Sequence, residues 1–317
     1  MSVPARVAIL GAGEIGSGWA ALFAAYGAEV RIFDRDTGAE QRSRAALTDA
    51  VRLGVGVDHM GSIDAYFDLD DAIEEAEWIQ EALPEERDIK REILGSLERT
   101  LSSGAIVASS SSSFTPTELA KGLSFAERLL VAHPLHPVYA VPVVELCGGI
   151  DTNPRTVERA AEVMRAVGRQ PIVLRSEVTG LVTNRLTAAL LREAFDLVTR
   201  GVVSLEDLDS LVSRGIALGW VAAGPLATEA IGAGNGGFPV FLNRYERPLA
   251  NIWKSLASWT SLSAEQRAAL EDASRNAWPA IDPLRADAAP TDIAQVAIGW
   301  SGKITEILRA AGATYEP

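Results

Sequence analysis

The segment Gly11-Ala12-Gly13-Glu14-Ile15-Gly16 is the feature that most constrains how this chain can fold. It follows Arg6–Leu10, a short apolar run, and precedes a small, apolar stretch typical of a buried helix. Glycines at this spacing allow a tight turn, close approach of a pyrophosphate to the backbone, and close packing of a helix on a strand. The pattern therefore predicts a dinucleotide-binding strand–turn–helix rather than an ordinary capped βα turn.

An acidic residue ends the next expected strand. Asp34 lies 34 − 16 = 18 residues after the third glycine. A carboxylate there accepts hydrogen bonds from adenosine ribose hydroxyls and repels a 2′-phosphate, while the helix N-terminus offers N–H groups to the phosphates. We therefore expect NAD as the cofactor. The residues expected to bind it in this region are Gly11, Ala12, Gly13, Glu14, Ile15, Gly16, Asp34 and Arg35.

Strand and helix patterns alternate through the first half of the chain. Strands are expected at 6–10, 29–34, 65–68, 78–83, 105–108, 129–132, 141–146 and 171–174. Helices are expected at 16–26, 36–55, 69–77, 85–101 and 156–168, and after the capping box formed by Thr115 and Glu118. This alternation predicts an α/β fold with a Rossmann-type, doubly wound and mostly parallel sheet, covered by helices on both faces.

From Gly180 onward strand signals fade and apolar residues recur at helical spacing. Helices are expected at 181–198, 204–211, 250–258, 264–277 and 293–311. The chain is therefore expected to form two domains, an NAD-binding Rossmann domain at 1–178 and an all-α domain at 179–317.

The net charge of −13 opposes binding to nucleic acid or to an anionic membrane. The single cysteine, Cys147, permits no intrachain disulfide, and no apolar run reaches the ~18 residues of a membrane span. The N-terminus does not have the pattern of a secretory signal. We therefore expect a cytoplasmic protein without a metal site.

Polar residues lie near or just after the ends of three of the expected strands. They are the serine run Ser109–Ser113, the histidines His133 and His136, and Glu145. Ligands of doubly wound sheets bind outside the carboxyl ends of the strands. Oxidising a secondary alcohol requires a base as the hydride leaves, and an imidazole, with an ordinary pKa of ~6.5, suits that task. The alternatives are a structural histidine, a flexible serine linker and a solvated edge carboxylate.

These residues, with Pro142-Val143-Val144-Glu145 and Gly180–Leu186, resemble the L-3-hydroxyacyl-CoA dehydrogenase superfamily. The resemblance is closest to its small-acid branch of lambda-crystallins, L-gulonate 3-dehydrogenases and L-carnitine dehydrogenases. It implies that His133 is the general base, that Glu145 orients it, and that Ser112 and Asn184 bond the reacting oxygen. The residues it further places near the cofactor are Glu85, Lys90 and Ser110. His136 is the rival base, at a position where the family often has asparagine.

The resemblance implies NAD-dependent oxidation of the 3-hydroxyl of a small, gulonate- or carnitine-like L-3-hydroxy acid, by a homodimer formed through the C-terminal helices. Relatives that use CoA carry a lysine-rich helical insertion after the second strand, whereas Arg35–Ser62 is short and contains no lysine. A free acid is therefore preferred over a CoA ester. A 3-hydroxyacyl-CoA dehydrogenase and a non-catalytic, crystallin-like NAD(H)-binding protein remain as alternatives.

One position departs from the small-acid relatives. These relatives tend to carry an arginine just before the aromatic residue at Trp220, where it could meet a substrate carboxylate. This chain has Gly219 instead. Arg185, Arg214 and Arg244 are the candidate substitutes.

Overall fold

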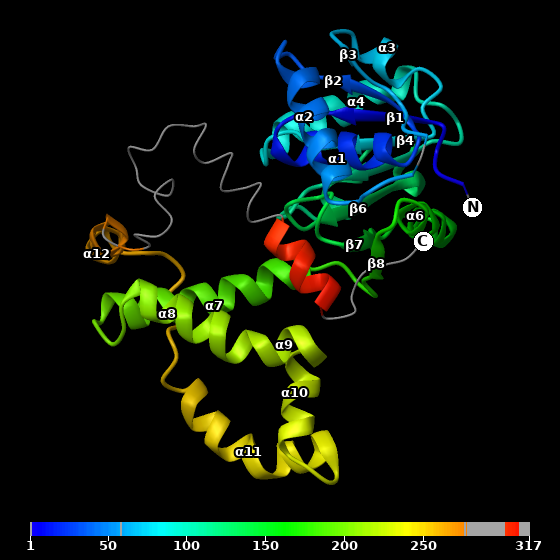
Figure 1. Cartoon of the computed structure of the whole chain (residues 1–317). Helices are drawn as coiled ribbons and strands as arrows, with labels where there is room; N and C mark the ends of the chain where they lie inside the picture. The colour runs from blue at the N-terminus through cyan, green and yellow to red at the C-terminus, as the bar shows by residue number, and fades with distance from the viewer. Residues whose placement is uncertain (1, 58, 276, 278–301, 311–317) are drawn as a thin grey trace. The chain divides into compact units, whose positions relative to one another are not determined.

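The computed structural model describes residues 2–57, 59–275, 277 and 302–310. Contacts divide the chain into two units, which are coloured along the sequence in Figure 1. The sheet unit comprises Met1–Asn184 and Ile298–Pro317, and the helical unit comprises Arg185–Ala297. The helix at 302–310 therefore groups with the sheet unit, where the Arg309 guanidinium donates to the carbonyl of Leu53 over 3.0 Å. Of the helix expected at 293–311, positions 293–301 and 311 lie outside the described residues.

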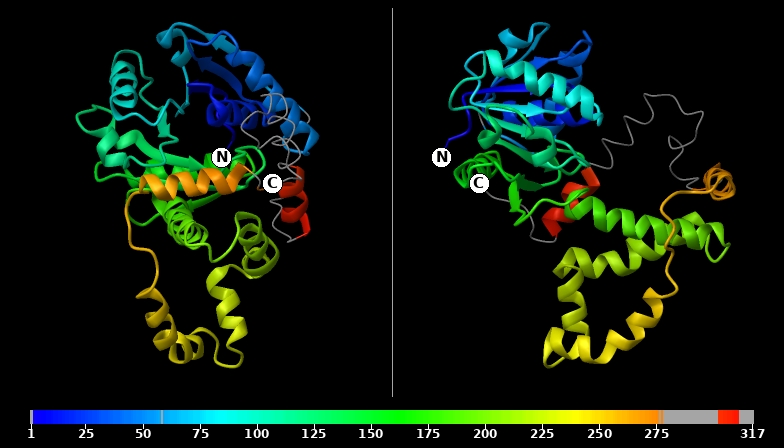
Figure 2. Two further views of the ribbon diagram at one scale, coloured as in Figure 1. Left: turned by 90° about the vertical axis from the view of Figure 1, so that its left-hand side faces the viewer. Right: turned by 180° about the vertical axis from the view of Figure 1, so that it is seen from behind.

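An eight-stranded sheet with the order β3-β2-β1-β4-β5-β6-β7-β8 forms the centre of the sheet unit (Figure 2). Its strands are β1 (Arg6–Leu10), β2 (Glu29–Phe33), β3 (Ile63–Tyr66), β4 (Trp78–Glu81), β5 (Ile106–Ser109), β6 (Leu129–Pro134), β7 (Val143–Gly148) and β8 (Gln170–Val173). The chain builds outward from β1 to β3 and then crosses back to β4, so the strand order reverses between β1 and β4. Doubly wound sheets bind their ligands at this reversal. The expected Rossmann-type, mostly parallel sheet is confirmed.

The direction of β7 is the main departure inside the sheet. β7 pairs with β6 antiparallel, whereas all other neighbouring strands pair in parallel. A short connection of eight residues, 135–142, joins β6 to β7, and a tight return of this kind favours an antiparallel pair. Glu145 was expected near the carboxyl end of its strand, and this is wrong, because it is the third residue of β7. It still lies opposite His133 at the edge where β6 ends, because the antiparallel β7 begins there.

Helices cover both faces of the sheet, as expected. They are α1 (Glu14–Ala25), α2 (Ala39–Arg52), α3 (Leu69–Ile73), α4 (Arg87–Ser96), α5 (Pro116–Ala120) and α6 (Pro154–Ala166). Side chains of β1 point alternately to the two faces of the sheet and so contribute to two core clusters. Val7 and Ile9 belong to the cluster that α1 and α6 share. Ala8 and Leu10 belong to a second cluster, shared with α3, α4 and α5. Because β1 is buried on both faces, its sequence is a continuous apolar run.

The helical unit continues α7 (Leu181–Thr199), which begins in the sheet unit. Its other helices are α8 (Leu205–Leu211), α9 (Ala217–Ala223), α10 (Pro225–Gly232), α11 (Gly237–Trp253) and α12 (Ala264–Arg275). The helix expected at 250–258 is wrong in position, and α9 and α10 were not expected. No helix was expected at 219–249, where glycines and Pro248 weaken the helical signal, yet α11 continues through Pro248 and packs against α10.

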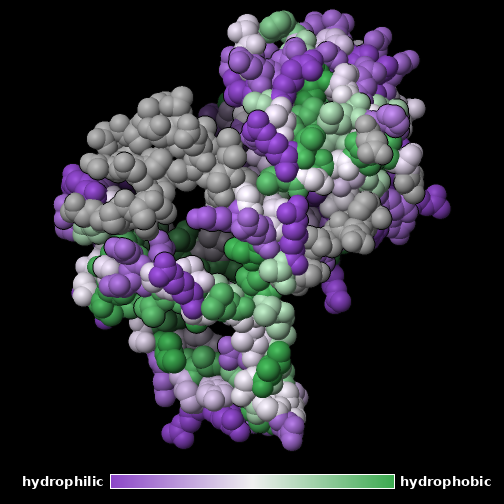
Figure 3. All heavy atoms as spheres, viewed as in Figure 1, coloured by the Kyte–Doolittle hydropathy of each residue, from purple (hydrophilic) through white to green (hydrophobic). Residues whose placement is uncertain are grey.

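The helical unit has almost no buried side chains. Among its described residues only Ala194 and Ala233 are buried, each with 8% of its surface exposed. Figure 3 shows apolar side chains at its surface, and Leu226 and Ile231 of α10 are 68% and 71% exposed. In the described part of the chain no single helix is long and apolar enough to span a membrane, although α8 to α10 pass this test as one bent pair.

Candidate active site

The glycine loop between β1 and α1 has the geometry that a dinucleotide requires. Gly11 has a φ of +89°, which side chains disfavour. A Cβ on Gly16 would lie 1.8 Å from the Gly11 carbonyl oxygen, whereas a Cβ on Gly13 would meet nothing within 4 Å. Gly16 therefore lets α1 pack against the loop, and the backbone at Gly13 borders open space. The loop fits a pyrophosphate at the N-terminus of α1.

A cavity of about 720 Å³ opens beside this loop. Its lining includes Gly11, Gly13, Glu14, Ile15, Asp34, Arg35, Ile89 and Ile93. The carboxylate of Asp34 accepts a hydrogen bond from the Ala12 N–H over 2.6 Å, so the acid at the end of β2 fixes the glycine loop. Ala12 and Gly16 do not line the cavity but support it. Apolar side chains from α4 form one wall and the Asp34 carboxylate another, an arrangement that fits an adenosine.

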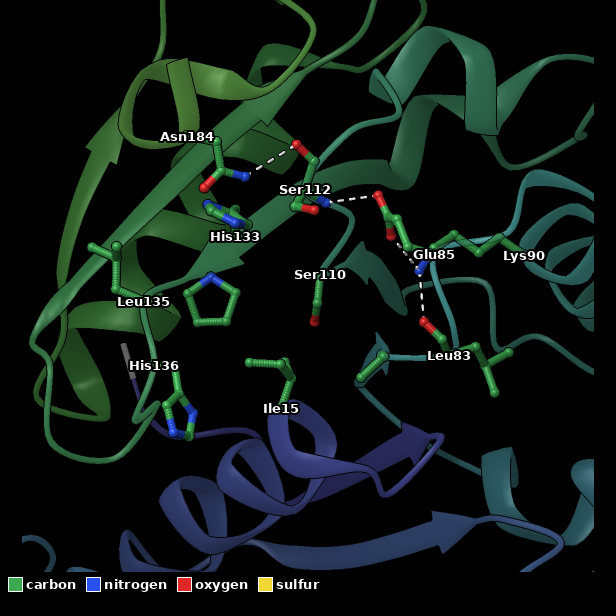
Figure 4. A pocket seen from close by; sticks show the side chains of 12 residues that line it. Ile15, Leu83, Glu85, Lys90, Ser110, Ser112, His133, Leu135, His136 and Asn184 are labelled. Atoms are coloured by element: carbon green, nitrogen blue, oxygen red, sulfur yellow. Dashed lines mark hydrogen bonds and ion pairs between the residues drawn. The ribbon is translucent and has the colours of Figure 1, made fainter. Parts of the chain in front are cut away.

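A second cavity of about 410 Å³, which shares Ile15 with the first, is drawn in Figure 4. It is lined by Ile15, Ala82, Leu83, Glu85, Lys90, Ser110, Ser112, His133, Pro134, Leu135, His136 and Asn184. These residues come from the start of α1, the segments after β4 and β5, helix α4, the end of β6 with the loop that follows it, and the first turn of α7. The structure therefore brings three of the four expected catalytic residues to one cavity with four expected cofactor residues. The fourth expected catalytic residue, Glu145, lies behind them.

His133 and Glu145 form a buried pair. The two residues are 7% and 2% exposed, and His133 Nδ1 lies 3.0 Å from Glu145 Oε2. They are direct partners in the antiparallel register of β6 and β7, and residues opposite each other on such strands have adjacent side chains. The antiparallel register, rather than a common carboxyl edge, therefore places the carboxylate behind the imidazole.

The start of α7 holds the Glu145 carboxylate. Its Oε1 accepts from the N–H groups of Val182 and Thr183 over 2.9 and 3.1 Å, and its Oε2 accepts from the Thr183 hydroxyl over 2.6 Å. Burial by itself raises the pKa of this carboxyl, but these bonds and the one to His133 outweigh burial and hold the pKa below its usual value. Thr183 was missed from the sequence, although its place in the first turn of a helix is a recognisable signal for carboxylate binding.

Successive serines of the run Ser109–Ser113 alternate between two environments. Ser109 donates to Glu81 over 2.5 Å, and Ser111 and Ser113 donate to Glu85 over 2.6 Å each. Ser110 and Ser112 line the smaller cavity instead. Ser112 is held from two sides. The Asn184 amide donates to its carbonyl over 3.4 Å, and its N–H donates to Glu85 over 3.0 Å (Figure 4).

Lys90, Glu81 and Glu85 form an ionic cluster behind the serines. Lys90 Nζ lies 2.8 Å from Glu81 and 3.2 Å from Glu85, and Lys90 and Glu81 are 1% and 0% exposed. Burial opposes ionisation of Glu85, but hydrogen bonds from Ser111 and Ser113 and the Lys90 charge lower its pKa to about 2. Glu81 was missed from the sequence because an acid inside an apolar strand gives no periodic signal.

His136 lines the same cavity but has a different partner. Its Nε2 lies 3.1 Å from Glu14 Oε1, on the glycine loop. The two histidines therefore differ in surroundings, since His133 pairs with a buried carboxylate and His136 with one whose side chain is 73% exposed. No group of three or more potential metal ligands occurs among the residues that the structure describes.

A local contact explains why position 219 is a glycine. A Cβ there would lie 2.7 Å from Cγ2 of Thr228, whose hydroxyl donates to the Gly219 carbonyl over 2.8 Å. The contact between α9 and α10 thus leaves no room for an arginine side chain at this position. Of the candidate substitutes, Arg244 places its guanidinium 6.0 Å from the ring centroid of Tyr245, and Arg185 and Arg214 lie in α7 and in the π-helical turn Val212–Ile216.

Two family models match the chain. The model described as "3-hydroxyacyl-CoA dehydrogenase, NAD binding domain" matches residues 6–178, and that described as "3-hydroxyacyl-CoA dehydrogenase, C-terminal domain" matches residues 180–270. Together they cover the sheet of the sheet unit and most of the described helical unit.

The chain is similar to curated proteins and to solved structures. An L-carnitine dehydrogenase of Oceanobacillus iheyensis is 35% identical over 79% of this chain and 83% of its own. The lambda-crystallin of Oryctolagus cuniculus is 34% identical over 81% and 84%. A structure named 5-formyl-3-hydroxy-2-methylpyridine 4-carboxylic acid 5-dehydrogenase, an NAD+-dependent dismutase, is 28% identical over 98% and 99%, with a TM-score of 0.82.

Proposed function

The chain belongs to the 3-hydroxyacyl-CoA dehydrogenase family, and we propose that it oxidises the 3-hydroxyl of a small L-3-hydroxy acid with His133 as general base. Membership of this family makes it an NAD-dependent oxidoreductase, in which bound NAD accepts the hydride. The observation that carries the finer proposal is the buried His133–Glu145 pair at a cavity next to the glycine loop.

The pair has the arrangement that base catalysis needs. Because Nδ1 of His133 faces the Glu145 carboxylate, the proton resides on Nδ1, and Nε2 remains as the acceptor for the substrate hydroxyl proton. Glu145 then stabilises the imidazolium that forms when that proton arrives. The hydroxyl of Ser112 and the amide of Asn184 line the same cavity, and both are neutral donors that can stabilise developing negative charge on the substrate oxygen.

The charge of the chain favours a free acid over a CoA ester. The net charge is −13, and the 35–62 segment contains no lysine. Three of its arginines, Arg42, Arg44 and Arg52, form ion pairs with acids of the same segment. L-carnitine dehydrogenases among the relatives act on a small hydroxy acid of this kind. We place the enzyme in the cytoplasm, since a single buried cysteine suits a reducing compartment.

A second candidate is oxidation of an aldehyde on an aromatic acid. The observation that favours it is the match over 98% of this chain, at a TM-score of 0.82, to the pyridine-carboxylate dehydrogenase named above. The absent arginine at position 219 favours it too, because the carnitine and gulonate branch tends to carry one there. A non-catalytic crystallin-like role is less favoured, because such a protein needs no buried His–Glu pair.

A substrate panel with NAD tests these assignments. NADH formation at 340 nm is followed with L-carnitine, L-gulonate, L-3-hydroxybutyrate and a formyl-pyridine carboxylate, and NADH consumption is followed with acetoacetyl-CoA. We expect the highest kcat/KM with a free L-3-hydroxy acid. A higher value with the pyridine aldehyde or with acetoacetyl-CoA would replace the proposal by the corresponding alternative, and NAD binding without turnover of any compound would support the crystallin-like role.

We further propose that the helical unit forms a homodimer. Its described residues bury only two alanines, and a chain segment without a core cannot offset the conformational entropy of ordering its helices. Large exposed apolar surfaces of soluble proteins are typical of interfaces. Apolar side chains of α9, α10 and α11 that a second copy would cover include Leu218, Val221, Leu226, Ile231 and Trp253.

A further inference from the structure

Ser110 accepts two hydrogen bonds from rigid, buried donors. Trp19 Nε1 of α1 donates to its hydroxyl over 3.1 Å, and Gln80 Nε2 of β4 donates to it over 2.8 Å. Trp19 and Gln80 are both 0% exposed. In the part of the chain that the structure describes, these are the only hydrogen bonds of the Ser110 hydroxyl.

The orientation of the Gln80 amide is fixed by a third residue. Trp78 lies two residues earlier on the same face of β4, and its Nε1 lies 3.1 Å from Gln80 Oε1. An indole N–H can only donate, so the oxygen of the amide must face Trp78 and its NH₂ group must face Ser110. Trp78 is also 0% exposed, so no water competes for this bond.

These contacts determine which role Ser110 can take toward a ligand. A serine hydroxyl has two lone pairs and one hydrogen. Trp19 and Gln80 occupy both lone pairs, so only the hydrogen is left for the cavity that Ser110 lines. Ser110 is therefore an obligate donor at that surface, whereas an isolated serine could donate or accept.

The position of Ser110 indicates which ligand atom it meets. Figure 4 shows Ser110 between Ile15, at the start of α1, and Ser112. Its donor Trp19 belongs to α1, the helix that begins at the glycine loop. We propose that Ser110 donates its hydrogen to the carboxamide oxygen of the nicotinamide, and that Trp19, Gln80 and Trp78 form a relay that fixes this polarity. The inference rests on the proposed NAD-dependent function, and it assigns a cofactor-orienting role to three buried side chains outside the glycine loop.

Cofactor binding without substrate tests the relay. The dissociation constants of NAD and of its thionicotinamide analogue are measured by titration calorimetry, since the sulfur of the analogue is a weaker acceptor. Native protein should bind NAD several-fold more tightly than the analogue. Ser110→Ala should weaken NAD binding by about tenfold, as expected for one lost hydrogen bond, and should bring the ratio of the two constants close to one.

Two further variants keep the test decisive if Ser110→Ala does not fold. Ser110→Cys fills the same space with a poor donor and should change the ratio in the same direction. Trp19→Phe frees one lone pair of Ser110 and should weaken NAD binding by only about twofold. An unchanged ratio in Ser110→Cys, or an unchanged dissociation constant of NAD in Ser110→Ala, would overturn the carboxamide assignment. Both outcomes are measured by cofactor binding alone, so neither depends on which substrate the enzyme turns over.

Discussion

The sheet unit and the helical unit differ in how they bury their apolar side chains. In the sheet unit Trp19, Phe23 and Trp78 are 0% exposed. In the helical unit Trp253 is 61% exposed and Leu226 is 68% exposed. One chain therefore suffices to build the cavity beside the glycine loop and the His133–Glu145 pair, whereas the described helices that follow bury only two alanines. The central claim is therefore that the chemistry belongs to the sheet unit and that the helical unit is completed by a second copy.

The largest expected effect tests whether the sheet unit carries the chemistry. His133→Ala should lower kcat/KM by roughly 10²–10⁴-fold, the range that general base catalysis contributes. His136→Ala is the matched comparison, because His136 lines the same cavity but pairs with Glu14. It should lower kcat/KM less than tenfold. Steady-state kinetics of both variants decide between the histidines, and a larger loss in His136→Ala would make His136 the base.

A core substitution sharpens the contrast between the two units. Phe23→Ala removes a fully buried ring that packs against Trp19 and Trp78, and it should destabilise the protein by about 3–5 kcal/mol. Denaturant unfolding measured at two protein concentrations should give the same loss in the free energy of unfolding at both. Leu226→Ala should instead lower the free energy of unfolding only by the amount by which it weakens dimerisation. If the losses in Phe23→Ala and Leu226→Ala depended equally on protein concentration, the proposed difference between the two units would be contradicted.

A smaller effect concerns the charge cluster behind the serines. The pKa of Glu85 is about 2 in the folded protein and 4.5 ordinarily. Its ionised form therefore stabilises the fold above pH 4.5, and this contribution is lost as the pH falls from 4.5 toward 2. Unfolding free energies measured at pH 6 and pH 3 should differ less in Glu85→Gln than in the native protein. An equal difference would mean that Glu85 is not the group responsible.

The sequence predicted the sheet unit well because its signals are local. The glycine loop, Asp34 and the Thr115 capping box each depend on residues close in sequence, and all are in the expected places. The family resemblance drawn from these motifs is confirmed by the matches to both family models. His133, Ser112 and Asn184 were brought together as the resemblance implied, although their catalytic roles stay a prediction.

The errors arose where the outcome depends on residues far apart in the chain. Strand direction leaves no periodic trace, so the antiparallel β7 was not foreseen, and the contact of Glu145 with His133 came from its register. Trp19 and Gln80 meet Ser110 from different elements, and no spacing predicts such a meeting. In the helical unit, glycines and prolines concealed α10 and much of α11, because packing between helices outweighed local propensity.

Sedimentation velocity at micromolar concentration tests the central claim most directly. The native chain, of 33.7 kDa, should sediment as a dimer of about twice that mass. Leu226→Glu, which places a charge on the exposed face of α10, should shift the protein toward the monomer while NAD binding is retained. A native protein that sediments at 33.7 kDa with its full helical content by circular dichroism would contradict the claim that the helical unit needs a second copy.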